Sequence, residues 1–161
     1  MADDHTTIAV AGHEVRVSNP GKVFFPGPGY TKLDLIEYYL TLSEPVINQL
    51  RDRPTVLKRF VDGAAGKPFF QKRIPDSAPA WLQMATVTFP SGREARELLP
   101  NDAAHLVWGV NLGVIDWNPW QVRKGDLDHP DELRVDLDPT PEATWDDVRQ
   151  VALCAFWAAI A

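Results

Sequence analysis

Two aspartates, Asp136 and Asp138, stand two residues apart in the segment Arg134-Val135-Asp136-Leu137-Asp138-Pro139. In a β-strand alternate side chains share a face, so both carboxylates would project from one side, roughly 6–7 Å apart. Such a pair can hold divalent cations and direct them at phosphate oxygens. Asp-x-Asp pairs are also common in solvated turns, so the spacing alone leaves both interpretations open.

The charged residues are distributed unevenly along the chain. The formal net charge is −6, which by itself argues against a nucleic-acid partner. Between Arg51 and Arg73, however, seven residues are basic and two acidic, whereas between Asp126 and Asp147 nine are acidic and one basic. A protein that grips a phosphate backbone and also binds metal needs both kinds of surface. An ordinary mixed surface is the alternative that composition leaves open.

Composition bounds the class of protein. A length of 161 residues with 45% hydrophobic content predicts one globular domain with a core. The sequence has no run of about eighteen apolar residues and no basic-then-apolar N-terminal signal, so neither a membrane span nor secretion is expected. The single cysteine, Cys154, cannot form an internal disulfide, and we expect a cytoplasmic protein.

Periodicity and turn residues predict an α+β fold with mixed or antiparallel sheets and flanking helices. Residues 1–14 are expected to be loosely ordered, and residues 15–161 to form the folded part. The Gly-containing turn at 62–66 predicts a β-hairpin between its flanking strands. The expected strands cover 14–17, 55–61, 69–74, 86–89, 113–117 and 133–137.

Three helices are expected, each beginning at a capping residue. Asn101 is the expected N-cap of a helix that runs to about Leu112. Pro45 is expected to kink or divide the first helix near Glu44. Polar pairs three residues apart predict variant capping boxes for the first and last helices: Thr31 with Asp34, and Thr144 with Asp147.

Five motifs occur in an order that one known family shares. They are Asn19-Pro20-Gly21-Lys22-Val23-Phe24-Phe25-Pro26, Tyr30-Thr31-Lys32, Arg53-Pro54-Thr55-Val56-Leu57-Lys58-Arg59-Phe60, Pro68-Phe69-Phe70-Gln71-Lys72 and the Asp136-Leu137-Asp138 segment. Over about residues 15–153 the chain resembles the polymerase domain of bacterial DNA ligase D, a member of the archaeo-eukaryotic primase superfamily. The resemblance implies a primase-polymerase-like fold, of which the chain is the N-terminal portion, ending after the helix that follows the Asp-x-Asp strand.

The resemblance also implies an activity: template-directed nucleotidyl transfer on DNA ends in non-homologous end joining, with Mn²⁺ or Mg²⁺ as cofactor. Asp136 and Asp138 match catalytic, metal-binding aspartates of the family. Lys22 and Lys32 match the two lysines that grip the 5′-phosphate at a DNA gap or break. The implied partners are DNA ends with a 5′-phosphate, nucleoside triphosphates, Ku and a DNA ligase.

Three further residues match positions near the template and the nucleotide. Phe70 corresponds to the aromatic residue that stacks on a template base, whereas strand alternation sends its neighbour Phe69 toward the core. Lys58 and Arg59 fall near the incoming nucleotide. They alternate along one strand, so at most one of the two is expected to reach that ligand.

Two departures from the family pattern bear on activity. The family's Ser-Gly-Ser-x-Gly-x-His triphosphate segment and its third metal-binding aspartate are not found in these residues, and Asn118 stands where many members have His. Polymerase activity is therefore expected to be impaired. A non-catalytic module that binds 5′-phosphorylated DNA ends and an inactive product of a truncated gene are the alternatives.

The last helix is unusually apolar. After Val151 it has no polar residue other than Cys154, so no polar face is left for solvent. An exposed helix of this kind favours association. We expect self-association through this helix, or a partner chain that covers it.

Overall fold

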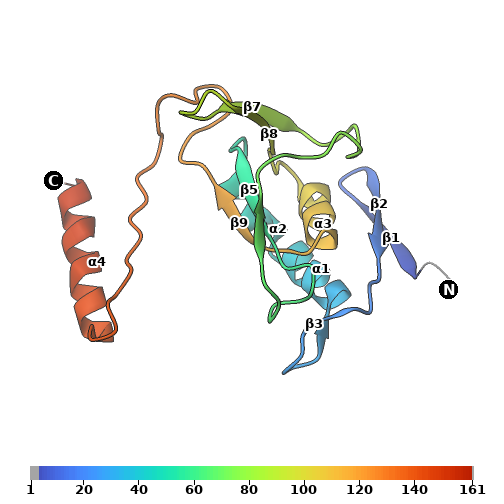
Figure 1. Cartoon of the computed structure of the whole chain (residues 1–161), viewed down its shortest axis with the longest axis horizontal. Coiled ribbons are helices and arrows are strands. Elements are labelled where there is room, and N and C mark those ends of the chain that lie inside the picture. The colour runs from blue at the N-terminus through green and yellow to red at the C-terminus, as the bar shows by residue number, and fades with distance from the viewer. Residues whose placement is uncertain (1–3, 161) are drawn as a thin grey trace. The chain divides into compact units, whose positions relative to one another are not determined.

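All strand pairings in the computed structural model, which describes residues 4–160, are antiparallel, and helices accompany the sheets (Figure 1). The expected α+β class is confirmed. The chain divides into two compact units, one ending at Asp131 and the other beginning at Glu132. The first unit contains β1 (His5–Val10), β2 (His13–Ser18), β3 (Val23–Phe25), β4 (Tyr30–Thr31), α1 (Lys32–Thr41), α2 (Ser43–Leu50), β5 (Thr55–Arg59), β6 (Phe69–Gln71), β7 (Met84–Thr88), β8 (Glu94–Leu98), α3 (Ala103–Asn111) and β9 (Val114–Pro119); the second contains α4 (Trp145–Ile160).

The largest sheet is organised around β5. Its strand order is β6-β5-β8-β7, and β9 also pairs with β5. The predicted hairpin is confirmed as β5 and β6, in which Lys58 lies opposite Phe70 and Arg59 opposite Phe69. Opposite residues of a strand pair share a face, so Lys58 with Phe70 and Arg59 with Phe69 form two sets on opposite faces of the sheet.

The helix boundaries follow the capping chemistry at most positions. Thr31 and Asp34 form the expected capping box, and the first helix divides at Leu42, just before Pro45. The predicted N-cap Asn101 is wrong by one residue. Asp102 caps α3 instead, and its carboxylate accepts hydrogen bonds from the backbone N–H groups of Ala104 and His105.

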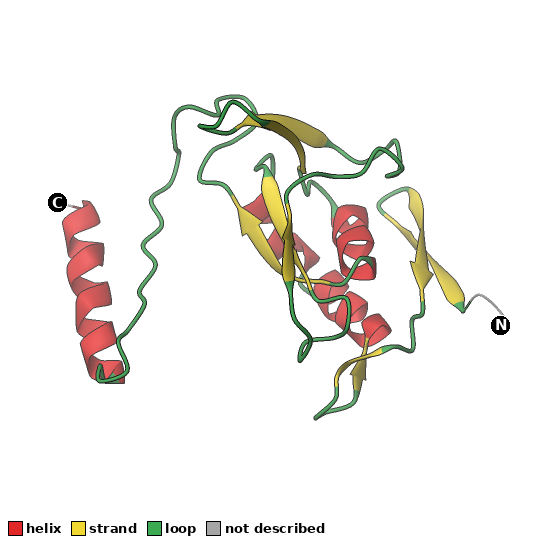
Figure 2. Cartoon of the chain, in the orientation of Figure 1, coloured by secondary structure: helices red, strands yellow, loops and turns green. Residues whose placement is uncertain are grey.

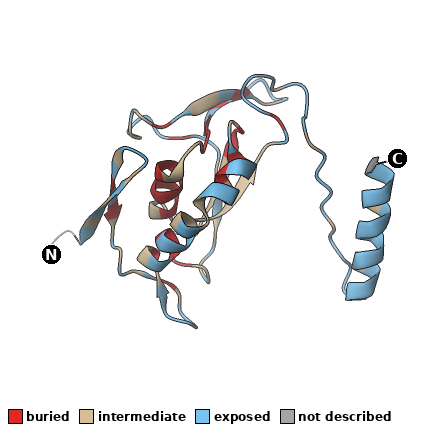
Figure 3. Ribbon diagram, turned by 180° about the vertical axis from the view of Figure 1, so that it is seen from behind, coloured by how far each residue is buried: buried red, intermediate tan, exposed pale blue. Residues whose placement is uncertain are grey.

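Helix α3 lies at the centre of the core. Its residues from Ala104 to Val110 are buried, whereas α1 and α2 expose their outer faces (Figure 3). The side of α3 packs on α1 and on β2. Its apolar residues join Val17, Phe24 and Leu57 in one cluster, so the core holds together the elements that carry the candidate site.

Two expected features differ in the structure. Residues His5–Val10 are not loosely ordered but form β1, which pairs with β2 along its whole length. The strand expected over 133–137 is wrong, because this segment pairs with no other strand in the described part of the chain and is drawn as loop in Figure 2. An unpaired segment leaves its backbone N–H and C=O groups to solvent.

The second unit contains the loop from Glu132 and helix α4. The predicted capping box is confirmed: the backbone N–H and hydroxyl of Thr144 donate to Asp147 at 2.8 and 2.6 Å. The large apolar side chains of α4 are exposed, including Val151, Phe156 and Trp157. Among the described residues, no helix has the length and apolarity needed to cross a membrane.

Candidate functional site

Three cationic side chains line one small pocket of the first unit. Lys22 lies in the turn before β3, Lys32 is the first residue of α1, and Arg59 is the last residue of β5. The pocket has a volume of about 180 Å³, and none of the described residues that line it is acidic. Three positive groups without a carboxylate beside them create a strongly positive local potential. The arrangement is suited to binding an anion.

Lys32 is the most buried of the three cations. Its side chain is 5% exposed, and its Nζ donates to the Ser18 carbonyl at 2.5 Å and to the Asn111 carbonyl at 3.2 Å. Burial, and to a smaller extent the neighbouring charge of Lys22, lowers the pKa of Lys32 below the ordinary lysine value. Lys22 donates through its own Nζ to the Val61 carbonyl, at another wall of the pocket.

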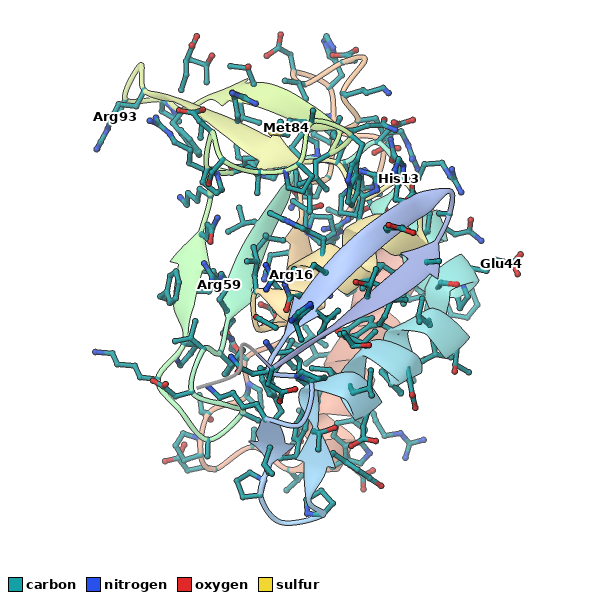
Figure 4. All side chains as sticks on the ribbon, turned by 90° about the vertical axis from the view of Figure 1, so that its right-hand side faces the viewer. His13, Arg16, Glu44, Arg59, Met84 and Arg93 are labelled. Carbon is teal, nitrogen blue, oxygen red and sulfur yellow. The ribbon has the colours of Figure 1, made fainter. Side chains whose placement is uncertain are left out.

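Arg59 approaches the pocket from the sheet (Figure 4). Its Nε donates to the Leu112 carbonyl at 2.8 Å, and its Nη1 donates to Gln71 Oε1 at 2.6 Å. The guanidinium also lies 5.1 Å from the ring centroid of Phe69. Partial burial lowers the pKa of Arg59, although an arginine remains charged at any physiological pH.

The other set of candidate residues includes Lys58 and Phe70. Lys58 Nζ lies 3.1 Å from Asp116 Oδ2 on β9 and 5.7 Å from the ring centroid of Phe70. The Phe70 side chain is 59% exposed, so its ring is available to a ligand. The expectation that Phe69 belongs to the core is wrong, because this ring is 44% exposed and lies beside Arg59.

Asp136 and Asp138 lie in the second unit. Both are exposed, in the loop between Glu132 and α4. Carboxylate oxygens are the ligands that Mg²⁺ and Mn²⁺ prefer, so the donor chemistry fits. Within residues 4–160, no group of three His, Cys, Asp or Glu side chains is close enough to hold a metal ion. The strand that would put both carboxylates on one face is not formed, and the shared face stays a prediction.

Sequence reasoning missed three residues that shape these sites. Asp116 is the ion-pair partner of Lys58, Asn111 is the partner of Lys32, and Gln71 orients Arg59. The Lys58 and Lys32 pairings join elements 58 and 79 residues apart, which no local motif reveals, whereas Gln71 faces Arg59 across the predicted β5–β6 hairpin. Asn118 lies on β9 opposite Val56, and its side-chain amide contacts Asp116 at 3.5 Å.

A larger pocket of the first unit, about 690 Å³, has a different character. It is lined mainly by apolar and aromatic side chains such as Tyr30, Tyr38 and Tyr39, and its one charged lining residue is Asp34. It offers no cation to a phosphate group. Its size therefore does not make it a candidate for DNA-end recognition.

Comparisons with known proteins identify the family of this chain. The family described as LigD, primase-polymerase domain, matches residues 31–156. The multifunctional non-homologous end joining protein LigD of Mycolicibacterium smegmatis is 30% identical over 86% of this chain and 18% of its own length, and that of Pseudomonas aeruginosa is 32% identical over 85% and 16%. The chain thus spans less than a fifth of the length of these relatives.

A solved structure is also similar to this chain. It is the polymerase domain of Mycobacterium tuberculosis ligase D in complex with DNA, with a TM-score of 0.65 and 32% identity. The match covers 68% of this chain and 38% of that domain. The likeness therefore covers most of this chain but a minor part of the solved domain.

Proposed function

Because this chain belongs to the LigD primase-polymerase domain family, we propose that it binds DNA ends that carry a 5′-phosphate and takes part in nucleotidyl transfer during non-homologous end joining. The observation that carries the proposal is the pocket lined by Lys22, Lys32 and Arg59. A terminal phosphate is a compact dianion, and cationic side chains without a competing carboxylate favour its binding.

Phe70 and Lys58 support contact with the nucleic acid beyond the terminal phosphate. An exposed ring can stack on any base, which contributes about 1–3 kcal/mol per base without selecting its identity. Lys58 lies beside this ring and forms an ion pair with Asp116. We propose that its ammonium approaches the phosphates of an incoming nucleotide. Phe70 is the proposed template-base platform, and Lys58 the proposed nucleotide contact.

Asp136 and Asp138 are the proposed ligands for Mn²⁺ or Mg²⁺. Divalent ions bound there would help to activate a primer 3′-hydroxyl and to neutralise charge on a triphosphate. The two aspartates supply the oxygen ligands, and the rest of the coordination shell must come from substrate, water or further residues. The 161-residue polypeptide by itself is therefore expected to transfer nucleotides weakly.

A binding experiment tests the proposal. Affinity for a gapped DNA duplex is measured by fluorescence anisotropy, with and without a phosphate at the 5′ side of the gap. We expect tighter binding to the phosphorylated gap, and we expect Lys22→Met to remove most of the difference. Arg93→Gln, which removes an exposed cation at the β7–β8 turn, is the matched control and should keep it (Figure 4). Equal affinity of the unaltered chain for both duplexes would refute phosphate recognition.

A second assay tests the aspartates. Primer extension on the phosphorylated gap is measured with Mn²⁺ and ribonucleotides for the chain and for Asp136→Ala. Any extension should be lost in the variant. Extension that survives Asp136→Ala would reject Asp136 as a metal ligand.

The geometry gives specific support to one second candidate function, a non-catalytic module for DNA-end binding. The phosphate pocket and the Phe70 platform all belong to the first unit. Phosphate-dependent binding without nucleotide addition, in the two assays above, would identify this function. Ku and a DNA ligase are the proposed protein partners in either case, in the cytoplasm.

A further inference from the structure

The larger apolar pocket of the first unit has mostly aromatic walls. Its volume is about 690 Å³, and four rings contribute to its lining: Phe25, Tyr30, Tyr38 and Tyr39. Tyr30 and Tyr38 are each 57% exposed, so both rings are open to a ligand. The rings of Tyr38 and Tyr39 lie 5.6 Å apart at an angle of 80°, which makes them two walls at nearly a right angle. Aromatic walls of this kind attract a cation through the ring quadrupole.

Contacts behind the pocket hold its walls in place. The Tyr39 hydroxyl donates to the Ile115 carbonyl at 2.7 Å, and the Tyr39 ring packs against Trp117 with centroids 6.1 Å apart. Phe25 and Tyr30 lie opposite each other in the β3–β4 pair, which fixes the wall that faces α1. A site formed before its ligand arrives loses little conformational entropy on binding.

One carboxylate, that of Asp34, lies among these rings. Its Oδ2 accepts hydrogen bonds from the backbone N–H and the hydroxyl of Thr31, both at 2.7 Å. Its Oδ1 has no protein partner within the described residues and is available to a ligand. The bonds from Thr31 lower the pKa of Asp34, so the carboxylate is ionised at neutral pH.

The exposed surface beside the pocket carries only negative charge. Residues 33–50 include three acidic residues, Asp34, Glu37 and Glu44, all exposed, and no Lys or Arg (Figures 3 and 4). The basic residue of α1, Lys32, is 5% exposed, and its ammonium donates to backbone carbonyls of β2 and α3 instead. Such a surface repels a polyanion such as nucleic acid and attracts a basic partner.

We infer that this pocket is a docking site for a basic, apolar peptide segment of a partner protein. A lysine or arginine of the segment lies between the tyrosine rings with its charged end at Asp34, because an apolar stem and a cationic head match these two features. The volume lies within the range of roughly 300–1,000 Å³ that ligand pockets have, so a neighbouring aliphatic side chain can share the site. The site shares no lining residue with the phosphate pocket, and it adds protein recognition to the proposed function without depending on it.

Helix α4 of a second copy is an apolar alternative, but its charges fit less well. Its first turn contains Asp146 and Asp147, and its one cation, Arg149, already pairs with Asp146 at 3.3 Å. An acidic helix end gains no attraction from the Asp34 carboxylate. Charge complementarity therefore favours a basic partner over a second copy.

Peptide binding to the whole chain tests the docking site. Fluorescence anisotropy is measured with labelled Leu-Lys-Leu-Lys-Leu and with two counterparts, Leu-Glu-Leu-Glu-Leu and Ser-Lys-Ser-Lys-Ser. We expect the first peptide to bind roughly tenfold more tightly than either counterpart, since only it supplies both cation and apolar surface. Its affinity should fall as salt rises. Equal affinity for the first peptide and for either counterpart would overturn the inference.

Variants of the pocket locate the binding. Tyr38→Ala should weaken binding of Leu-Lys-Leu-Lys-Leu about fivefold through loss of the ring, whereas Tyr38→Phe should keep the affinity. Asp34→Asn keeps an oxygen for the Thr31 cap and should weaken binding roughly three- to fivefold, with a smaller salt dependence. Glu44→Gln removes an exposed carboxylate of α2 outside the pocket and is the matched control. Melting temperatures establish that each variant is folded. Unchanged affinity in Tyr38→Ala and Asp34→Asn, or an equal loss in Glu44→Gln, would overturn the assignment.

Two measurements separate other occupants of the pocket. Tyr38→Ala should leave the affinity for a single-stranded oligonucleotide unchanged; a loss would assign the rings to base stacking and overturn peptide docking. The molar mass of the chain in light scattering should not fall when the basic peptide is added; a fall would assign the pocket to a second copy of the chain. Neither result bears on 5′-phosphate recognition, which the gapped duplexes test independently.

Discussion

Glu97 is a buried carboxylate whose removal should stabilise the protein. It lies on β8 with no exposed surface, and neither of its side-chain oxygens has a hydrogen-bond partner among the described residues. Burial raises the pKa of Glu97 from 4.5 to about 7, against smaller opposing effects of the Trp120 indole and the Lys72 ammonium. The ionised form is therefore unfavourable in the folded state.

The magnitude follows from the size of this pKa change. An increase from 4.5 to about 7 corresponds to roughly 3 kcal/mol of extra cost for ionising Glu97 in the folded state. The raised pKa means that the protonated form is favoured by folding. The stability that protonated Glu97 gives to the folded state is thus complete below pH 4.5 and is lost as pH rises through about 7. Glu97→Gln mimics the protonated form and should gain about 1–3 kcal/mol near pH 8 and almost nothing near pH 4.5.

Urea unfolding of the unaltered chain and of Glu97→Gln at several pH values between these limits measures the effect. Burial is the chief cause of a lowered pKa at His105, so protonation of this residue weakens the folded state as pH falls below 6.5. This effect is common to both proteins and cancels in the difference between their unfolding free energies. Glu94→Gln alters an exposed glutamate of the same strand and is the matched control. A difference in unfolding free energy that does not vary with pH would refute the reasoning.

Three further predictions concern packing, an ion pair and association. Gly109→Ala should lower stability by about 1–3 kcal/mol in thermal melts, because a Cβ there would lie 2.3 Å from the Trp117 ring; an unchanged melting temperature would contradict this packing. Arg53 donates to both oxygens of Asp131 and holds the pKa of that carboxyl at about 2. The stabilisation of the folded state by this ion pair is therefore present above pH 3.8 and lost as pH falls toward 2. In acid titrations, Asp131→Asn should remove this part of the change of unfolding free energy with pH. Trp157→Glu should reduce self-association measured by light scattering, and an unchanged mass would exclude α4 as the contact.

Local chemistry was sufficient to predict several parts of the fold. The Gly-containing turn at 62–66 fixed the β5–β6 hairpin, and the pairs Thr31 with Asp34 and Thr144 with Asp147 located two helix starts. Asn101 was misassigned because it and Asp102 are equally good caps by type. The side chain of Asn101 is instead bound to the backbone N–H of Asp52, 49 residues away, which local patterns do not reveal.

Tertiary context decided the remaining features. Phe69 was expected in the core from strand alternation, but β6 is a terminal strand of its sheet and the ring lies beside Arg59 at the surface. The aspartate segment has strand-like alternation but no partner strand within the described residues. Lys22 and Lys32 were identified through family resemblance, whereas the place of Arg59 in their pocket required the three-dimensional path of β5.

The central claim is that the cationic pocket of the first unit recognises a DNA 5′-phosphate. Amide NMR shifts of the chain, recorded with one gapped duplex in its 5′-phosphorylated and 5′-hydroxyl forms, test it most directly. We predict that the difference between the two spectra is concentrated at Lys22, Arg59 and the adjacent wall at Leu112 and Gly113. Identical spectra, or differences centred elsewhere, would contradict the claim.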